Sequence, residues 1–203
     1  GPDACGKTTQ IKLLETEFAK RGVVSHVIHY SNIKLESNEK IKLASQLRYR
    51  EMFNILNMSS HLNNFILDRS HVGEAVYSPI YRGYNGDFVF DYEKQFLLKA
   101  HQLTKLVLFT DDAEKIIERD KARGDGLSFS LDIKRKKQEL DAFDRAFNMS
   151  SLDKIRIPLE GRGPEEIWKE LHKRSSETHP DDNPSILKYS DGVPKLLENG
   201  YVQ

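Results

Sequence analysis

The first nine residues carry the side chains whose types and spacing point most directly to chemistry. Glycines spaced as they are here let the backbone wrap around phosphate oxygens, and a helix that begins at such a loop directs free N–H groups at them. Lys7 would reach the β- and γ-phosphates of a nucleotide, and the Thr8 hydroxyl would bind Mg²⁺. The stretch fits the pattern G-x-x-x-x-G-K-S/T, which predicts a site for ATP and Mg²⁺ formed by Gly1, Asp3, Ala4, Cys5, Gly6, Lys7, Thr8 and Thr9. A loop that only caps the following helix is the alternative interpretation.

A second group of charged side chains follows an apolar stretch in the middle of the chain. Residues 65–67 predict a buried strand, and Asp68 and Arg69 come directly after it. In open parallel sheets, ligands bind beyond the carboxyl ends of the strands. Asp68 could hold Mg²⁺ or accept a proton there, and Arg69 could bind a phosphate through two hydrogen bonds. A salt bridge that closes the strand end is the alternative.

Three further segments have compositions that suit a nucleotide. Residues 71–86 combine several tyrosines with Arg82, which suits a flat base next to a phosphate, although a packed tyrosine-rich loop would look the same. Arg119 and Arg123 end a predicted helix before a polar loop, from which arginines could close over a transferred phosphoryl group and stabilise its charge. Surface charge is the competing interpretation. The turn that contains Arg162 could hold an adenine.

Strand-like and helix-like stretches alternate along the chain, and this order predicts a three-layer α/β sandwich with a parallel sheet and helices on both faces. We expect one kinase-type domain over residues 1–174, with a lid at about 124–134 and an extended tail over 175–203. Buried strands are predicted at 23–30, 65–68, 103–110 and 155–159. Helices are predicted from the first loop to Gly22 and at 39–60, 92–101, 111–123, 131–148 and 164–174.

A phosphate-binding loop normally follows a buried strand that lies in the middle of such a sheet. No such strand precedes Gly1 in this sequence. We therefore expect two unpaired strand edges, and about six to ten apolar residues upstream of Gly1 in the complete protein. An expression scar at Gly1-Pro2 is the alternative explanation.

The overall composition narrows the range of partners. The chain of 203 residues has 31 basic and 31 acidic side chains, so its charge favours neither long nucleic acids nor membranes as principal partners. No apolar run is long enough to span a bilayer. Its single cysteine excludes an internal disulfide and fits a reducing compartment, which predicts a cytoplasmic protein. A small-molecule nucleotide is the expected partner, and a homodimer is left open.

In this order the motifs resemble the P-loop nucleoside monophosphate kinases, most closely the thymidylate kinases of the bacteriophage type. The resemblance covers about residues 1–174. The motifs that carry it are G-x-D-x-x-G-K-T-T-Q at residues 1–10, Asp68-Arg69 followed by Val76-Tyr77, Arg119 with Arg123-Gly124, and Phe143-x-Arg145.

The resemblance implies roles for individual residues. Asp3 would approach the sugar hydroxyl of the accepting nucleotide, Arg69 would bind its 5′-phosphate, and Phe53 or Tyr77 would contact its base. The transferred phosphoryl group would be surrounded by Lys7, Arg119 and Arg123. Two departures bear on base specificity: His29-Tyr30-Ser31 replaces the Arg-Glu-Pro of thymidylate kinases, and the lid has no arginine between residues 124 and 131.

Three functions follow as hypotheses. The first is a kinase that transfers phosphate from Mg²⁺-ATP to a deoxynucleoside monophosphate, with dTMP as the expected acceptor. A phosphate acceptor needs no strong general base, and the sequence shows no obvious His–Asp pair. The second is a deoxynucleoside or polynucleotide 5′-hydroxyl kinase, in which Asp68 would take the hydroxyl proton. Asp68-Arg69-Ser70 is similar to the Glu-Arg-Ser of deoxynucleoside kinases. The third is a non-catalytic ATP-binding regulatory module.

Overall fold

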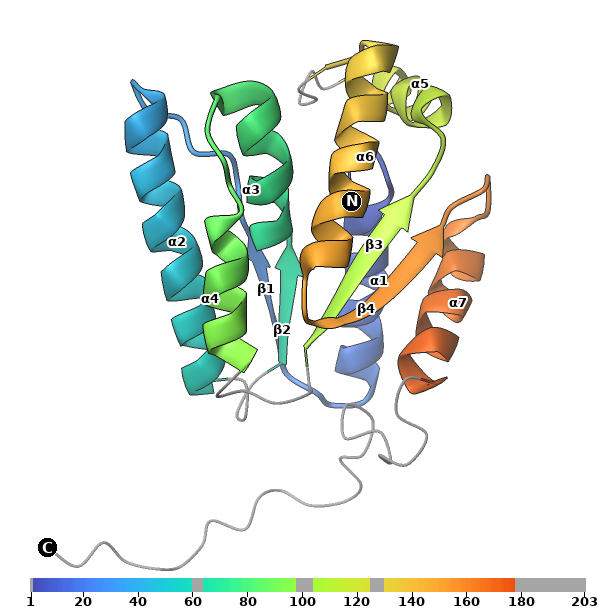
Figure 1. Cartoon of the computed structure of the whole chain (residues 1–203). Coiled ribbons are helices and arrows are strands. Elements are labelled where there is room, and N and C mark those ends of the chain that lie inside the picture. Colours follow the sequence, from blue (N-terminus) through green and yellow to red (C-terminus); the bar gives the residue numbers. More distant parts are fainter. Residues whose placement is uncertain (1, 60–63, 98–103, 125–129, 178–203) are drawn as a thin grey trace, which may run out of the picture.

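A computed structural model describes residues 2–59, 64–97, 104–124 and 130–177, in which strands and helices alternate as predicted (Figure 1). The strands are β1 (Ser25–His29), β2 (Asn64–Asp68), β3 (Lys105–Thr110) and β4 (Asp153–Pro158). The helices are α1 (Lys7–Lys20), α2 (Asn38–Ser59), α3 (His71–Tyr77), the π-helical η1 (Ser78–Arg82), α4 (Phe88–Leu97), α5 (Ala113–Arg123), α6 (Ile133–Met149) and α7 (Pro164–Glu177). Residues 125–129 of the predicted lid, and the predicted tail beyond residue 177, lie outside the described residues.

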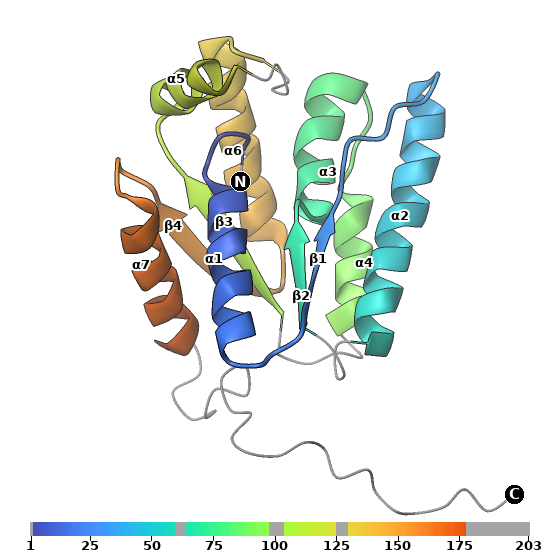
Figure 2. The same ribbon diagram turned by 180° about the vertical axis from the view of Figure 1, so that it is seen from behind.

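The four strands run parallel and form two separate pairs. In the first pair, β1 and β2 place His29 directly beside Asp68. In the second, β3 and β4 place Lys105 beside Asp153. Figures 1 and 2 show β2 and β3 at the facing edges of the two pairs, and within the described part of the chain no strand pairing joins them. This arrangement agrees with the two unpaired strand edges expected from the sequence.

Helices cover both faces of the strands, which confirms the predicted α/β layers. Helices α1 and α7 lie on one face, whereas α3, α4 and α6 lie on the other, with α2 packed beside α4 (Figures 1 and 2). The carboxyl ends of the four strands point to one end of the molecule, and the loop that precedes α1 lies at that same end. The fold therefore brings the N-terminal loop and the strand ends together. Across the described ranges, no helix is long and apolar enough to cross a membrane.

Strand β1 is more exposed than its sequence suggests, so the prediction of a buried strand over 23–30 was wrong. Val24 before it is 67% exposed, and Val27 within it is 38% exposed. The reason is position: β1 lies at the outer edge of its pair and has β2 as its described neighbour. β-branched residues favour an extended backbone at an edge as well as in the interior.

The tyrosine-rich segment after β2 is helical over residues 71–82, and is therefore not the packed loop considered as the alternative. A buried carboxylate, Glu74, organises it by accepting hydrogen bonds from Ser78 Oγ (2.7 Å), Tyr84 Oη (2.5 Å) and Arg82 Nη1 (2.9 Å). The chain then turns back so closely that a Cβ on Gly86 would lie 2.4 Å from the Glu74 carbonyl oxygen. This polar network stabilises a helix that the local sequence does not favour.

The core divides into two clusters. The larger one joins α2, α3, α4, α6 and β3, and it includes Met52, Phe53, Val76, Phe96, Leu108 and Phe143. The smaller one lies around the second strand pair and includes Cys5, Ile116, Ile157 and Ile167. Because Cys5 belongs to the smaller cluster, the N-terminal loop is anchored in the core of the β3–β4 half.

Candidate active site

The N-terminal loop has the backbone of an anion-binding turn. Ala4 (φ 58°) and Gly6 (φ 69°) both adopt left-handed conformations, and helix α1 begins at Lys7. No side chain caps this helix, and its first turn contains no acidic residue, so its positive end is left for another anion. Thr8 and Thr9 are exposed at the start of the helix. From Pro2 to Lys7 the loop therefore has the shape that Gly6 suggested, whereas the predicted phosphate-loop residue Gly1 lies outside the described residues.

Lys7 and Cys5 lie in a weakly solvated part of the loop. Lys7 Nζ donates a hydrogen bond to the Pro2 carbonyl oxygen, 2.5 Å away. Burial lowers the pKa of Lys7, and the carboxylate of Asp3 opposes this shift. Burial also raises the pKa of Cys5, so that side chain is a protonated thiol that fills space. A phosphate beside Lys7 would favour its charged form.

Arg69 connects the end of β2 to the loop. Its Nη2 lies 3.1 Å from Oδ1 of the buried Asp3. The Arg69 backbone has φ 65°, a conformation that residues other than glycine adopt rarely. Such backbone strain persists where surrounding contacts hold it in place, often at ligand sites. The structure thus brings together two residues that are 66 positions apart in sequence.

A histidine–aspartate pair that was not expected from the sequence lies next to Arg69 at the end of β2. His29 Nδ1 is 2.8 Å from Asp68 Oδ2. The other carboxylate oxygen, Asp68 Oδ1, is buried and has no hydrogen-bond partner among the described residues. Neighbouring parallel strands carry the two side chains at the same level, so their pairing depends on strand register, which a single sequence does not reveal.

A second arginine reaches the loop from the other half of the fold. Arg119 on α5 donates from Nε to the Ala4 carbonyl oxygen (3.0 Å) and from Nη1 to Asp111 Oδ2 (2.8 Å). Its Nη2 is buried and has no partner in the described structure. Arg123, one turn further on, pairs with Asp120 at 2.7 Å. Asp111 follows β3 and is a residue that sequence reasoning missed, although an acid at the end of a strand is the signal that singled out Asp68.

The residues expected at the acceptor base occupy different environments. Tyr77 packs against Tyr81 and edge-on against Phe143, and burial raises its pKa well above 10, with the nearby Asp3 carboxylate adding to this effect. Phe53 is inside the larger core cluster, 5.0 Å from the ring of His71. The structure therefore brings Tyr77 close to the loop and places Phe53 deeper in the protein.

The two remaining predicted arginines are held by other groups. The Arg82 side chain is only 11% exposed and pairs with the buried Glu74 at 2.9 Å. Arg162, in the turn after β4, donates to the carbonyl oxygens of Pro158 and Leu159. That turn does lie near the loop helix, because Gln10 Nε2 donates to the Pro164 carbonyl oxygen (2.9 Å).

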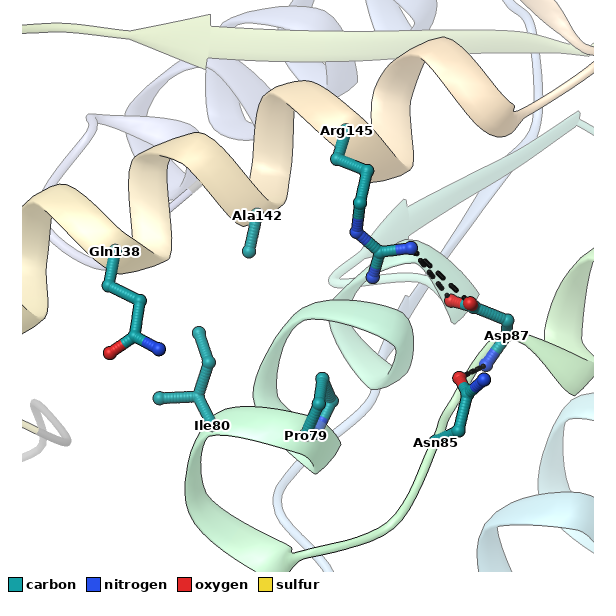
Figure 3. A pocket seen from close by; sticks show the side chains of 7 residues that line it. All are labelled: Pro79, Ile80, Asn85, Asp87, Gln138, Ala142 and Arg145. Atoms are coloured by element: carbon teal, nitrogen blue, oxygen red, sulfur yellow. Dashed lines mark hydrogen bonds and ion pairs between the residues drawn. The ribbon is translucent and has the colours of Figure 1, made fainter.

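The lining of an open cavity of about 380 Å³ includes none of the predicted catalytic or nucleotide-binding residues (Figure 3). Its lining comprises Pro79, Ile80, Asn85, Asp87, Gln138, Ala142 and Arg145. Arg145 Nη1 contacts both carboxylate oxygens of Asp87 at 3.2 and 3.3 Å, and its Nη2 donates to the Ala75 carbonyl oxygen. Because its guanidinium joins α6 to α3 and to the start of α4, we interpret Arg145 as a structural clamp.

Among the described residues, no group of three or more His, Cys, Asp and Glu side chains could hold a metal ion. Thr8 and Asp68 nevertheless fit Mg²⁺, because that ion keeps several waters and needs only one or two protein oxygens besides phosphate. The unpartnered Asp68 Oδ1 is an available oxygen of this kind.

Comparison with known proteins supplies the class of fold. No protein-family profile and no curated protein matches the sequence. Among solved structures, 62 chains match. The YorR protein from Bacillus subtilis, solved in complex with phosphorylated GDP, is similar with a TM-score of 0.64 and 23% identity over 88% of this chain and 95% of that one. This chain and the YorR protein therefore share an overall fold.

A second solved structure supports the same fold at greater distance. The deoxyadenosine kinase from M. mycoides, with its products dCMP and a flexible dCDP bound, matches with a TM-score of 0.56 and 10% identity. The match covers 86% of this chain and 95% of the kinase. At these identities the similarity establishes architecture, and the chemistry has to be argued from the residues of this chain.

Proposed function

We propose that this protein transfers a phosphoryl group from Mg²⁺-ATP to a deoxynucleoside monophosphate, with dTMP as the first acceptor to test. The observation that carries the proposal is the Asp3–Arg69 contact, because it joins a phosphate-binding loop to an arginine at the end of a parallel strand. One anion site would then bind the donor, and a second cation beside it would bind an anionic acceptor. Nucleotide kinase chemistry consists largely of such positioning and charge stabilisation.

On the donor side, the loop of residues 2–8 would hold the ATP phosphates. Its backbone N–H groups and Lys7 would bind phosphate oxygens, and Cys5 would anchor the loop by its buried side chain. Thr8 and Asp68 would hold Mg²⁺, directly or through water, and bound Mg²⁺ would neutralise charge on the β- and γ-phosphates. Adenine would lie at the turn that contains Arg162. The observation in favour of this position is that the turn lies near α1.

On the acceptor side, Arg69 would bind the 5′-phosphate, and Asp3 would keep its guanidinium turned towards the loop. Tyr77 would contact the base or the sugar. Arg119, whose Nη2 is free to take a new acceptor, would stabilise charge on the transferred group, and Arg123 would add a second cation. Phe53 and Arg82 would support, from behind, the residues that contact the base.

A second candidate acceptor is a hydroxyl group, as in deoxynucleoside kinases. The His29–Asp68 pair favours it, since a buried carboxylate with one unpartnered oxygen is suited to accept a hydroxyl proton. A phosphate acceptor does not require that proton transfer. The two candidates therefore differ in how strongly turnover depends on Asp68.

The deciding experiment measures ADP release by the full chain with Mg²⁺-ATP against dTMP, the other deoxynucleoside monophosphates, thymidine and a 5′-hydroxyl oligonucleotide. We expect turnover with a monophosphate, and R69A should raise its KM by about 10- to 100-fold while ATP binding is retained. R174A, which removes an exposed arginine of α7, is the control. Turnover with thymidine or the oligonucleotide alone would reject the first acceptor class, and D68N should then lower kcat by about 10²- to 10⁴-fold. ATP binding without any acceptor turnover would identify a regulatory module.

A further inference from the structure

A buried carboxylate, that of Glu93 on α4, takes part in hydrogen bonds with two other parts of the chain. Its Oε2 lies 2.6 Å from His71 Nε2 and accepts from Ser150 Oγ at 2.7 Å, and its Oε1 accepts from the Ser151 backbone N–H at 2.5 Å. The side chains of His71 and Glu93 are 2% and 1% exposed. A carboxylate is buried at such a site only where donors compensate for the water that it loses. We refer to these four residues as the Glu93 network.

The Glu93 network joins the two halves of the fold. His71 is the first residue of α3, directly after the end of β2, whereas Ser150 and Ser151 connect α6 to β4. Within the described ranges, no strand pairing links the β1–β2 pair to the β3–β4 pair (Figures 1 and 2). Because hydrogen bonds to one buried carboxylate are directional, they fix the spacing of the two halves more closely than apolar packing would alone.

The ring of His71 is held in place on more than one side. Its centroid lies 5.0 Å from that of Phe53 on α2 and 6.1 Å from that of Phe90 on α4, both in edge-to-face orientation. Two residues earlier, Arg69 has its left-handed backbone conformation. The turn that carries Arg69 therefore lies between the end of β2 and a histidine whose position is fixed by the network, and such surroundings are what maintains a strained backbone.

The two parts of the candidate active site are anchored in different halves. The N-terminal loop is held to the β3–β4 half by the buried Cys5 and by Arg119 on α5, whereas Arg69 follows β2. The direct contact between Asp3 and Arg69 involves an arginine side chain that is 28% exposed, so it is less constrained than the buried network. The spacing of the halves therefore determines where Arg69 lies relative to the loop.

We propose that Glu93 is a positioning residue for phosphoryl transfer, which acts through His71 and the two serines to hold Arg69 at a fixed distance from the N-terminal loop. The proposal rests on the function proposed above, in which Arg69 binds the acceptor phosphate. A displacement of about 1 Å between reacting groups can lower a rate by roughly 100-fold. Loss of the network should therefore impair use of the acceptor and leave ATP binding, which depends on the loop, unchanged.

Two substitutions of His71 separate positioning from packing. H71F keeps a ring between Phe53 and Phe90 but removes the donor to Glu93, whereas H71Q supplies an amide N–H near the position of Nε2. We expect H71F to lower kcat/KM for the acceptor by about 10- to 100-fold without changing the Kd for ATP. H71Q should recover most of that loss. E93Q should resemble H71F, because it leaves at least one of the three donors without an acceptor.

A variant of lower stability with an intact network is the matched control. Leu56 is buried in the same core cluster, one turn beyond Phe53 on α2. L56A should lower the Tm at least as much as H71F does, because it leaves a cavity in the core. Its kcat/KM for the acceptor should nevertheless equal that of the parent chain, since the hydrogen bonds of Glu93 remain.

A distance measurement separates this proposal from the proposed function, since it requires no turnover. Spin labels at N54C on α2 and K169C on α7, both at exposed positions, report the spacing of the two halves by pulsed electron spin resonance. The single native cysteine is buried, so the labels attach to the introduced ones. H71F should broaden the distribution of distances between the labels, and H71Q should restore the narrower distribution of the parent chain.

The outcomes distinguish the two proposals. A distance distribution that H71F leaves unchanged would overturn the positioning role, whatever the activity. An H71Q variant as impaired as H71F would also overturn it, and so would an L56A variant that loses as much kcat/KM, because ring packing or general stability would then explain the effect. A parent chain without acceptor turnover would reject the proposed function, while the spin-label distances would still decide whether the network fixes the two halves.

Discussion

Substitution of Gly86 by alanine is the sharpest test of the packing around α3. Gly86 is buried where the chain passes the backbone of that helix. A Cβ at this position would lie 2.4 Å from the Glu74 carbonyl oxygen, 2.7 Å from the Glu74 carbonyl carbon and 3.0 Å from Ala75 Cα. All three atoms belong to the backbone, so no side-chain rotation can relieve the clash. The chain at residue 86 must therefore move away from α3 by roughly 1 Å to reach ordinary contact distances.

The cost of that movement can be estimated. Overpacking of a well-packed interior usually costs about 1–3 kcal/mol, and a clash between two backbone segments belongs at the upper end of that range. The hydrogen bond from Tyr84 to Glu74 would also be strained, since Tyr84 lies just before the displaced residue. We expect G86A to lower the free energy of unfolding by about 2–3 kcal/mol. For a chain of this length, that corresponds to a Tm lower by about 4–12 °C.

Thermal and urea unfolding of the full chain, followed by circular dichroism, measure this effect. Gly73, within α3, is the matched control, because the nearest atoms to its added Cβ would be ring atoms of Tyr77 at 3.9 Å. G73A should therefore leave the free energy of unfolding unchanged or raise it by about 0.5–1 kcal/mol, since alanine has a higher helix propensity than glycine. If G86A is as stable as the parent chain, the close approach of this segment to α3 is wrong.

Two further predictions concern charged groups. D111N should lower kcat by about 100-fold with little change in the KM of the acceptor, because Arg119 would lose the carboxylate that holds its guanidinium beside Ala4. Steady-state kinetics measures both constants. An unchanged kcat would show that the Asp111 contact is purely structural. Burial raises the pKa of Glu93, but its hydrogen bonds with His71 and the residues that follow α6 outweigh this effect and hold the pKa below 4.5. Glu93 then contributes stability above pH 4.5 that is lost as the pH falls through the lower native pKa. Melting temperatures measured from neutral pH to pH 3 should fall more steeply below pH 4.5 in the parent chain than in E93Q, and parallel curves would exclude this role for Glu93.

The sequence predicted the loop, the order of elements and most helix positions, because these depend on local patterns. The stop of α1 near Gly22 and the start of α7 at Pro164 are examples in which one residue's backbone preference determines a boundary. Two of the predicted arginines contact the loop in the structure. Arg69 does so because the carboxyl end of β2 lies beside the loop, and Arg119 reaches it from α5.

Features that depend on pairing between distant segments were not predicted. The His29–Asp68 contact requires a particular register of β1 against β2, and a shift of one residue would turn one of the two side chains to the opposite face. Helix α3 contains glycine and is followed by Pro79, so its local propensity is poor, and it depends on a buried carboxylate whose partners come from outside the helix. Tertiary contacts override propensity in such segments.

The two arginine contacts of the loop also bear on the order in which the protein folds. Arg69 meets Asp3 across 66 residues, and Arg119 meets Ala4 across 115. Contacts that close such long stretches of chain carry the largest entropic cost, so they tend to form after local helices and the two strand pairs. We therefore expect the candidate active site to assemble late, when the β1–β2 and β3–β4 halves are already native-like. Substitutions at Arg69 or Arg119 should consequently speed unfolding far more than they slow folding.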